Sequence, residues 1–160
     1  MPWHPKQAVR RSTPTGLFAD LVRCGTRLYY ALNDRLREQH GIVTSQFGAL
    51  RYLRDHPESR VADLAAEFAI GIGAASKTVD RLEKQGRAVR QPDPSDRRSS
   101  LPTLTDDGLR LVDAAEGTFA ERLTELLADA LKASPLTAAG RALSELRSVL
   151  ERDHIGTPTG

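Results

Sequence analysis

The chain has 160 residues, of which 39% are hydrophobic and 28% are charged, and its formal net charge is only +2. This balance predicts one globular cytoplasmic domain, and a membrane span is excluded because no run approaches about 18 apolar residues. The single cysteine, Cys24, excludes an intrachain disulfide, and the four scattered histidines lack the spacing of metal ligands. We therefore expect no metal, no cofactor and no membrane partner.

The N-terminal part predicts an arm followed by one long helix. Residues 1–13 hold prolines and polar residues and predict a flexible arm. Residues 14–43 place apolar side chains at steps of three and four, which is the spacing of one helix face, and Gly41 marks the end of the helix. Cys24 falls on this apolar face, so we expect a buried and unreactive thiol.

The next part of the chain predicts three shorter helices. Thr44 is the expected N-cap of the first. Residues 61–70, "VADLAAEFAI", predict a second helix with Phe68 on its inner side, and "GIG" at 71–73 predicts a tight turn after it. The third helix, "AASKTVDRLEKQG", ends at Gly86. Two short helices joined by a glycine turn are typical of a helix-turn-helix motif.

A hairpin is expected after Gly86. The segments "RAVRQ" and "SSLPTL" predict two short strands on either side of the charged loop "PDPSDRR". Pro102 lies in the second strand, where proline is tolerated only at an edge or at an outward-facing position. Thr105 is the expected N-cap of the following helix, whose first turn holds Asp106 and Asp107.

Residues 105–153 predict two further helices, each with an apolar stripe. Ser134 and Pro135 are the expected N-cap and first residue of the second. Its stripe consists of Leu136, Ala139, Leu143, Leu146 and Leu150. Because a small winged domain does not need these stripes for its own core, we expect a two-fold homodimer. The predicted fold class is therefore mainly α with a small β-hairpin wing: a winged helix-turn-helix in residues 44–104 flanked by long N- and C-terminal dimerisation helices, with a tail at 154–160.

Polar and cationic side chains gather on the third short helix and on the hairpin. A serine or lysine near the start of such a helix can reach base edges in a major groove, and an arginine at a loop tip can enter a minor groove. The helix alone would also fit an ordinary solvated face, but the cations around the hairpin favour DNA. The candidate DNA-binding residues are Ser76, Lys77, Arg81, Lys84, Arg90, Arg97 and Arg98. Asp96 is expected to orient the wing by accepting hydrogen bonds from an arginine.

Four features between residues 61 and 108 resemble the MarR family of transcriptional regulators. They are "LAAEF", "VDRLEKQG", "DPSDRRSS" and "LTDDG", in the order and spacing of that family. The resemblance implies a two-fold dimer in which each subunit presents a winged helix to double-stranded DNA. It places Ser76, Lys77 and Arg81 in the major groove and Arg97 at the DNA backbone.

The wing also resembles that of the family, and the start of the third helix departs from it. Asp96 and Arg98 match the Asp-x-Arg pair of the family's wing, which implies that Arg98 enters the minor groove. Gly71 and Gly73 stand where the family usually has Ser, Thr or Arg. We therefore expect an operator that differs from those of better-known members.

Two sensing mechanisms are implied by the resemblance. Many members release DNA when a small phenolic or lipophilic effector enters a pocket between the dimer helices and the winged domain. Such a pocket could be lined here by Tyr29, Tyr30, His40, Phe47 and Arg51, which would otherwise be ordinary packing residues. A peroxide-sensing branch carries a reactive cysteine in its first helix, so a redox-responsive regulator using Cys24 is an alternative.

The predicted function is a homodimeric, sequence-specific DNA-binding transcriptional regulator, namely a ligand-responsive repressor of a pseudo-palindromic operator. The sequence has no phosphate-binding glycine loop and no nucleophile motif, so we expect no enzyme activity. The alternative is a winged-helix dimer that acts mainly through protein–protein contacts.

Overall fold

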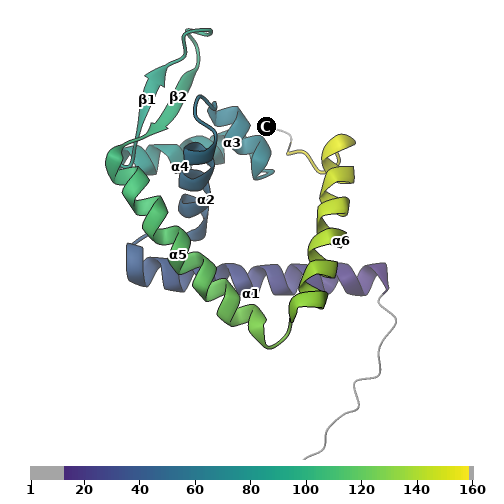
Figure 1. Ribbon diagram of the computed structural model, residues 1–160. Helices are drawn as coiled ribbons and strands as arrows, with labels where there is room; N and C mark the ends of the chain where they lie inside the picture. The colour runs from purple at the N-terminus through teal and green to yellow at the C-terminus, as the bar shows by residue number, and fades with distance from the viewer. Residues whose placement is uncertain (1–12, 159–160) are drawn as a thin grey trace, which may run out of the picture.

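The computed structural model describes residues 13–158 (Figure 1). Within them lie six helices and a two-stranded antiparallel sheet, which confirms the predicted fold class. The elements are α1 Pro14–His40, α2 Thr44–Asp55, α3 Val61–Glu67, α4 Ile72–Lys84, β1 Ala88–Pro92, β2 Ser100–Leu104, α5 Asp106–Ala128 and α6 Ala133–Arg152. Except for Thr13, the predicted N-terminal arm lies outside the described residues. No helix in the described part of the chain has the length and apolar content to cross a membrane.

The core joins the end of α1 and the start of α5 to the three short helices. Figure 1 shows α2, α3 and α4 grouped together, the hairpin projecting from them, and α5 running from the root of the hairpin across α1. The largest fully buried side chains are Leu36, Leu50, Leu64, Leu82, Val79 and Val112. Each such side chain stabilises the fold by about 1.5–3 kcal/mol through burial, so this core holds α4 and the hairpin in place.

Two predicted helix starts are wrong, and neighbouring polar groups explain one of them. Thr44 is the first residue of α2, because the side chain of Gln46 accepts a hydrogen bond from the N–H of Val43 (3.1 Å), which becomes the N-cap. The N–H of Thr44 donates instead to the side chain of Asn33 (2.7 Å). The buried Oγ1 of Thr44 has no hydrogen-bond partner among the described residues.

The start of α6 also lies earlier than predicted. Lys132 is the N-cap, and its carbonyl accepts from the N–H of Leu136 (3.0 Å), so Ser134 and Pro135 lie inside the first turn. Proline is tolerated there because the first four N–H groups of a helix have no intrahelical partner. By contrast, Thr105 is the N-cap of α5 as predicted, since its hydroxyl accepts from the N–H of Gly108 (3.1 Å).

The turn between α3 and α4 differs from the prediction. The left-handed residue of this turn is Ala69, with φ of 50°, while Gly71 is the N-cap of α4 and Gly73 lies within the helix. Phe68 is 44% exposed, so its predicted inner position is wrong. It follows the last residue of α3, Glu67, where the helical spacing that predicted an inner position no longer applies.

The hairpin accommodates Pro102 without losing a ladder bond. In the register, Arg90 pairs with Pro102. The N–H of Thr105 donates to the carbonyl of Arg87 (3.1 Å), so Arg87–Thr105 is a hydrogen-bonded pair. In an antiparallel ladder such pairs alternate with pairs that exchange no hydrogen bonds. Arg90–Pro102 lies three positions further along and is therefore a pair without hydrogen bonds. Both strands of a two-stranded sheet are edge strands, so Pro102 lies at an edge, where proline is tolerated. The ring of Pro102 is buried and does not face outward.

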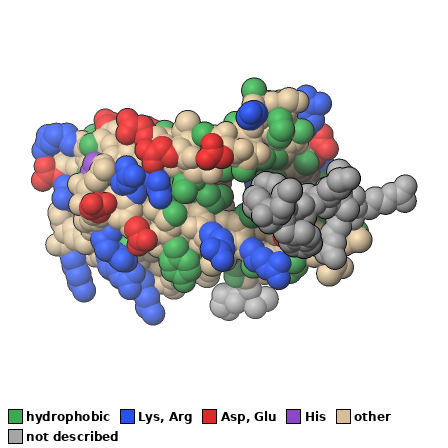
Figure 2. All heavy atoms as spheres, turned by 90° about the horizontal axis from the view of Figure 1, so that it is seen from below, with side chains coloured by type: hydrophobic (Ala, Val, Ile, Leu, Met, Phe, Trp, Pro, Cys, Tyr) green, Lys and Arg blue, Asp and Glu red, His purple; other side chains and the backbone are tan. Residues whose placement is uncertain are grey.

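Large apolar faces of α1 and α6 remain uncovered in one chain. Helix α6 has no buried residue. The exposed large apolar side chains of the two helices include Leu17, Phe18, Leu21, Val22, Leu136, Leu143, Leu146, Val149 and Leu150. Cys24 is also exposed, so its predicted burial is wrong for the single chain, because nothing in residues 13–158 covers this part of α1. Figure 2 shows hydrophobic side chains between groups of Lys and Arg on the face seen from below.

Candidate DNA-binding surface

Helix α4 separates its apolar and cationic side chains onto different sides. Ala75, Val79 and Leu82 are buried in the core. This packing turns Lys77, Arg81 and Lys84 to solvent, and none of the three forms an ion pair with another described residue. Unpaired cations on an exposed helix face are available to neutralise phosphates.

Arg90, on the first strand of the wing, is held by side chains of α4. Its guanidinium donates to Asp80 (2.6 Å) and lies 3.6 Å from Glu83. It also lies 3.4 Å from the hydroxyls of Ser76 and Ser100. Thus Ser76 and Arg90, both predicted to contact DNA, are engaged with each other, and Arg90 ties the wing to α4.

The wing tip is shaped by Asp96 through the backbone. Its carboxylate accepts from the backbone N–H of Arg98 (2.9 Å), and its carbonyl accepts from the N–H of Ser99 (3.0 Å). Arg97 and Arg98 are exposed, and within residues 13–158 neither guanidinium is ion-paired. Asp96 therefore fixes the turn that carries both arginines, and the DNA contacts of these residues stay a prediction.

A second ion pair, which was not predicted from the sequence, holds the base of the wing. The side chain of Asp93 is only 2% exposed and accepts from Arg60, the N-cap of α3 (2.8 Å). Its other oxygen accepts from the N–H (2.9 Å) and the hydroxyl (2.7 Å) of Ser95. These two bonds, followed by the Arg60 guanidinium, lower the pKa of Asp93. The Asp-x-Ser spacing in the sequence indicates the turn, but no local pattern indicates the contact between Asp93 and Arg60.

The root of the wing meets the start of α5 at very close range. The hydroxyl of Thr105 donates to the carbonyl of Gly86 (2.7 Å). Gly108 lies against the backbone carbonyl of Arg87, and a β-carbon at position 108 would overlap that oxygen. Glycine in the "LTDDG" segment is therefore required by packing between α5 and the strand.

Arg54 joins α2 to α5 and was also missed from the sequence. Its guanidinium donates to Glu116 (2.8 and 3.1 Å), Asp113 (3.0 Å) and Asp55 (2.8 Å). The hydrogen bonds from Arg54 lower the pKa of Glu116 and of Asp55, while these carboxylates raise the pKa of Arg54. Charged residues at helical spacing signal a solvated face, so the sequence alone gave no partner for Arg54.

Among the five predicted pocket residues, two lie against α5. Phe47 is buried and stacks on Phe119 with ring centroids 4.7 Å apart. The ring of His40 forms a hydrogen bond with the hydroxyl of Thr118 (2.8 Å). Phe47 and His40 therefore both have partners on α5 within the same chain.

The other three predicted pocket residues are exposed. Tyr29 and Tyr30 are 43% and 63% exposed and contact each other edge to face. Arg51 lies 3.5 Å from Glu116 at the surface of α2 and α5. The structure therefore does not bring the five side chains around one cavity within a single chain, and their role in binding an effector stays a prediction.

Comparison with known proteins agrees with this arrangement. Residues 40–99 match the model of the MarR family. The transcriptional repressor NicR of Pseudomonas putida is 32% identical over 152 residues, which cover 93% of this chain and 94% of NicR. The multiple antibiotic resistance protein MarR of Salmonella typhimurium is 32% identical over 99 residues, covering 58% of this chain and 68% of that protein.

Two solved structures share the fold over most of their length. Sco3205 of Streptomyces coelicolor, a MarR family regulator in complex with DNA, has a TM-score of 0.77 at 24% identity and covers 86% of this chain and 92% of its own. CouR of Rhodococcus jostii, bound to p-coumaroyl-CoA, has a TM-score of 0.68 at 26% identity and covers 96% of this chain and 98% of its own. NicR and Sco3205 are transcriptional regulators rather than enzymes, and the chain belongs to the MarR family of winged-helix transcriptional regulators.

Proposed function

We propose that the chain forms a homodimer that binds a pseudo-palindromic operator in double-stranded DNA and represses transcription. The observation that carries the proposal is that the cations of α4 and of the wing tip are exposed, and that none of them forms an ion pair within residues 13–158. Lys77 and Arg81 extend from α4, and Arg97 and Arg98 from the tip. The complex of Sco3205 with DNA and the repressor NicR support DNA binding and repression.

The uncovered apolar stripes support the dimer. Leu143 and Leu146 are 47% and 44% exposed in one chain, as are their neighbours along α6. Contiguous apolar surface of this kind is usually covered by a partner, and a two-fold dimer is the commonest arrangement. Such a dimer would present two α4 helices to half-sites about one helical turn apart.

Operator binding tests the DNA contacts. A duplex is selected from the region upstream of the gene, and its affinity is measured by fluorescence anisotropy over a range of salt concentrations. We expect log K to fall steeply with log salt. Arg98→Ala should weaken binding by about 1–3 kcal/mol, whereas Arg122→Ala, on the far half of α5, should not. Equal affinities for all three proteins, or no duplex preference, would favour action through protein–protein contacts.

Solution mass tests the dimer separately. Light scattering should give twice the chain mass for the wild type and one chain mass for Leu143→Glu combined with Leu146→Glu. Ser148→Glu, on the opposite side of α6, is the matched control and should remain dimeric. A monomeric wild type with intact operator binding would contradict the proposed dimer.

A further inference from the structure

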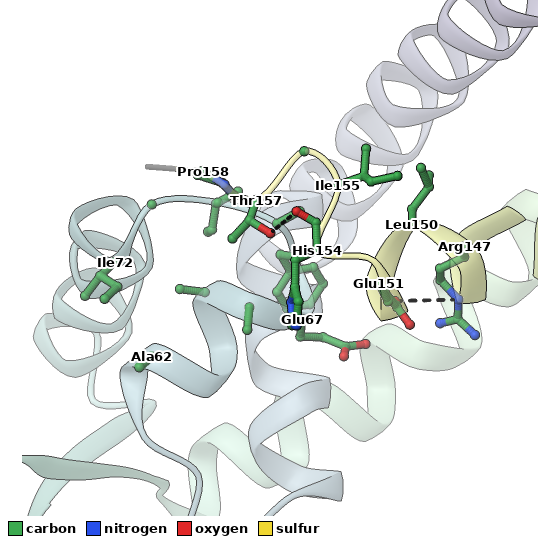
Figure 3. Close-up of a pocket in the computed structure, with 17 residues that line it drawn as sticks. Ala62, Glu67, Ile72, Arg147, Leu150, Glu151, His154, Ile155, Thr157 and Pro158 are labelled. Atoms are coloured by element: carbon green, nitrogen blue, oxygen red, sulfur yellow. Dashed lines mark hydrogen bonds and ion pairs between the residues drawn. The ribbon is translucent and has the colours of Figure 1, made fainter. Parts of the chain in front are cut away.

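Helix α3 contacts different parts of the molecule at its two ends. The turn that follows its last residue faces the last turn of α6 across a cavity of about 800 Å³ (Figure 3). Its first residues face the wing instead, because Arg60, the N-cap, reaches Asp93 just beyond the end of β1. Residues 93–99, between the two strands, form the wing loop. The wing therefore contacts the first helix of the helix-turn-helix as well as α4.

The backbone of Arg60 is fixed by α3. Its N–H donates to the side chain of Asp63 (2.8 Å), and its carbonyl accepts from the N–H groups of Asp63 (3.0 Å) and Leu64 (3.2 Å). Leu64 is buried in the core of the winged domain. Because a two-stranded hairpin is only marginally stable by itself, a contact with such a fixed backbone restricts the loop that the hairpin carries.

Asp93 gives this contact its strength. Its carboxylate is buried, while the side chain of Arg60 is 45% exposed. A buried carboxylate is costly unless it is both ion-paired and hydrogen-bonded. Among the described residues, Arg60 supplies the positive charge, and Ser95 supplies two hydrogen bonds. The wing loop is therefore most stable in the position that keeps Asp93 beside Arg60.

Hydrogen bonds continue from Asp93 to the tip of the wing. The carbonyl of Asp93 accepts from the N–H of Asp96 (3.3 Å), and its own N–H donates to the carbonyl of Ser99 (3.4 Å). The carboxylate of Asp96 accepts in turn from the N–H of Arg98 (2.9 Å). A series of bonded groups therefore connects Arg60 to the backbone of Arg98.

We infer that Arg60 and Asp93 are positioning residues of the wing, and that their ion pair holds the tip arginines where they contact the operator. The inference rests on the proposed function, because it concerns contacts with DNA. It divides the helix-turn-helix by role: α4 carries cations that face DNA, and α3 holds the wing in position. Neither Arg60 nor Asp93 has to touch DNA for this role.

Asp93→Asn separates this role from simple electrostatics. The substitution keeps the size of the side chain and removes a negative charge near the wing tip, so electrostatics alone would tighten DNA binding. The positioning role predicts the opposite sign: loss of the ion pair releases the wing loop, and the Kd for operator should rise about fivefold or more. Asp106→Asn, exposed at the start of α5 and not ion-paired within residues 13–158, is the matched control and should bind at least as tightly as the wild type.

Arg60→Met tests the other half of the ion pair in a double-mutant cycle. It removes the guanidinium from a half-exposed position, and circular dichroism checks that the variant is folded. The Kd for operator should rise about fivefold in the wild-type background. It should rise less than about twofold in a chain that already carries Arg97→Ala and Arg98→Ala, because no tip arginine is left to position. When Arg60→Met is combined with Lys77→Ala on α4, the two losses of affinity should multiply, since independent sites are additive in free energy.

Hydrogen exchange of the free protein tests the positioning without DNA. Mass spectrometry of peptides that cover residues 93–99 should show faster exchange in Arg60→Met than in the wild type. Peptides from α4 should exchange at the same rate in both proteins, because the local opening is confined to the wing.

Three results would overturn the inference. The first is unchanged or tighter operator binding by Asp93→Asn. The second is an equal loss of affinity from Arg60→Met with and without the tip arginines, which would mean that Arg60 contacts DNA itself or acts through general stability. The third is unchanged exchange of residues 93–99 in Arg60→Met. Failure of the wild type to bind operator would count instead against the proposed function, and the exchange rates would still decide whether the ion pair holds the wing.

Discussion

Replacing Gly108 by alanine tests the contact between α5 and the root of the wing. The added β-carbon would overlap the carbonyl oxygen of Arg87, which belongs to the backbone and cannot move as a flexible side chain can. Overpacking costs about 1–3 kcal/mol, and a backbone neighbour places this case near about 3 kcal/mol. Alanine regains at most about 1 kcal/mol of helix propensity. We therefore expect a net loss of about 2 kcal/mol in the free energy of unfolding.

Thermal unfolding followed by circular dichroism measures this loss. For a chain of this size, about 2 kcal/mol corresponds to a fall in Tm of about 4–8 °C. Gly117→Ala is the control, because a β-carbon at position 117 of the same helix meets nothing within 4 Å. It should raise Tm by about 2–4 °C. All proteins are compared at one concentration, since dimerisation makes Tm concentration-dependent.

The changes in stability caused by Gly108→Ala and Gly117→Ala must have opposite signs if the close packing at position 108 is correct. If Gly108→Ala were as stable as Gly117→Ala, the close contact with Arg87 would not exist in solution. If both lost stability equally, the effect would come from α5 in general and not from the wing root. Operator affinity of Gly108→Ala should also fall, because the displaced strand carries Arg90 and the tip.

Three further outcomes are expected. Thr44→Val should leave stability unchanged or raise it by up to about 1 kcal/mol in urea unfolding, because it removes a buried hydroxyl that has no hydrogen-bond partner within residues 13–158. Glu116, whose pKa is lowered from its ordinary 4.5 mainly by the hydrogen bond from Arg54, stabilises the fold above that pH and loses this contribution as the pH falls through its lower folded pKa. Wild type and Glu116→Gln should therefore differ in Tm at neutral pH, and the difference should shrink as the pH falls through the lowered folded pKa of Glu116. Lys84→Ala should reduce the salt slope of operator binding by about 1, whereas Arg90→Ala, which removes a paired cation, should weaken binding with little change in slope.

The sequence predicted a helix end correctly where the capping residue makes its contacts within the same helix. Thr105 and Gly41 were identified because their conformation depends on neighbours along the chain. Thr44 and Ser134 carry the same type of signal and were misplaced. The N–H of Thr44 is taken by Asn33 from another helix, a contact that no local pattern contains. Helix existence could thus be predicted, and helix ends only in part.

Burial of Cys24 could not be predicted from its spacing. The periodicity correctly groups it with the apolar face of α1, but periodicity does not say what covers that face. Among the described residues, the buried side chains of α1 are Leu32 and Leu36, both in the C-terminal half of the helix. The same limit applies to α6, whose regular stripe is buried by nothing in the described part of the chain.

For the candidate site, residue types could be predicted but their ion pairs could not. The sequence groups Arg90 with Lys84 and Arg98 as one basic cluster. Only the folded chain separates them, because Asp80 of the recognition helix comes within 2.6 Å of Arg90 while the other two stay unpaired among the described residues. The predicted contacts therefore divide into cations available for DNA and one that holds the wing.

The ion pairs of Arg90 and Arg60 connect the wing to helices α4 and α3. Arg90 fastens the first strand of the wing to α4, and Arg60, at the start of α3, fastens the base of the wing through Asp93. The wing is thus tied to both helices of the helix-turn-helix. A displacement of the α3–α4 turn that preserves both ion pairs therefore moves α4 and the wing together.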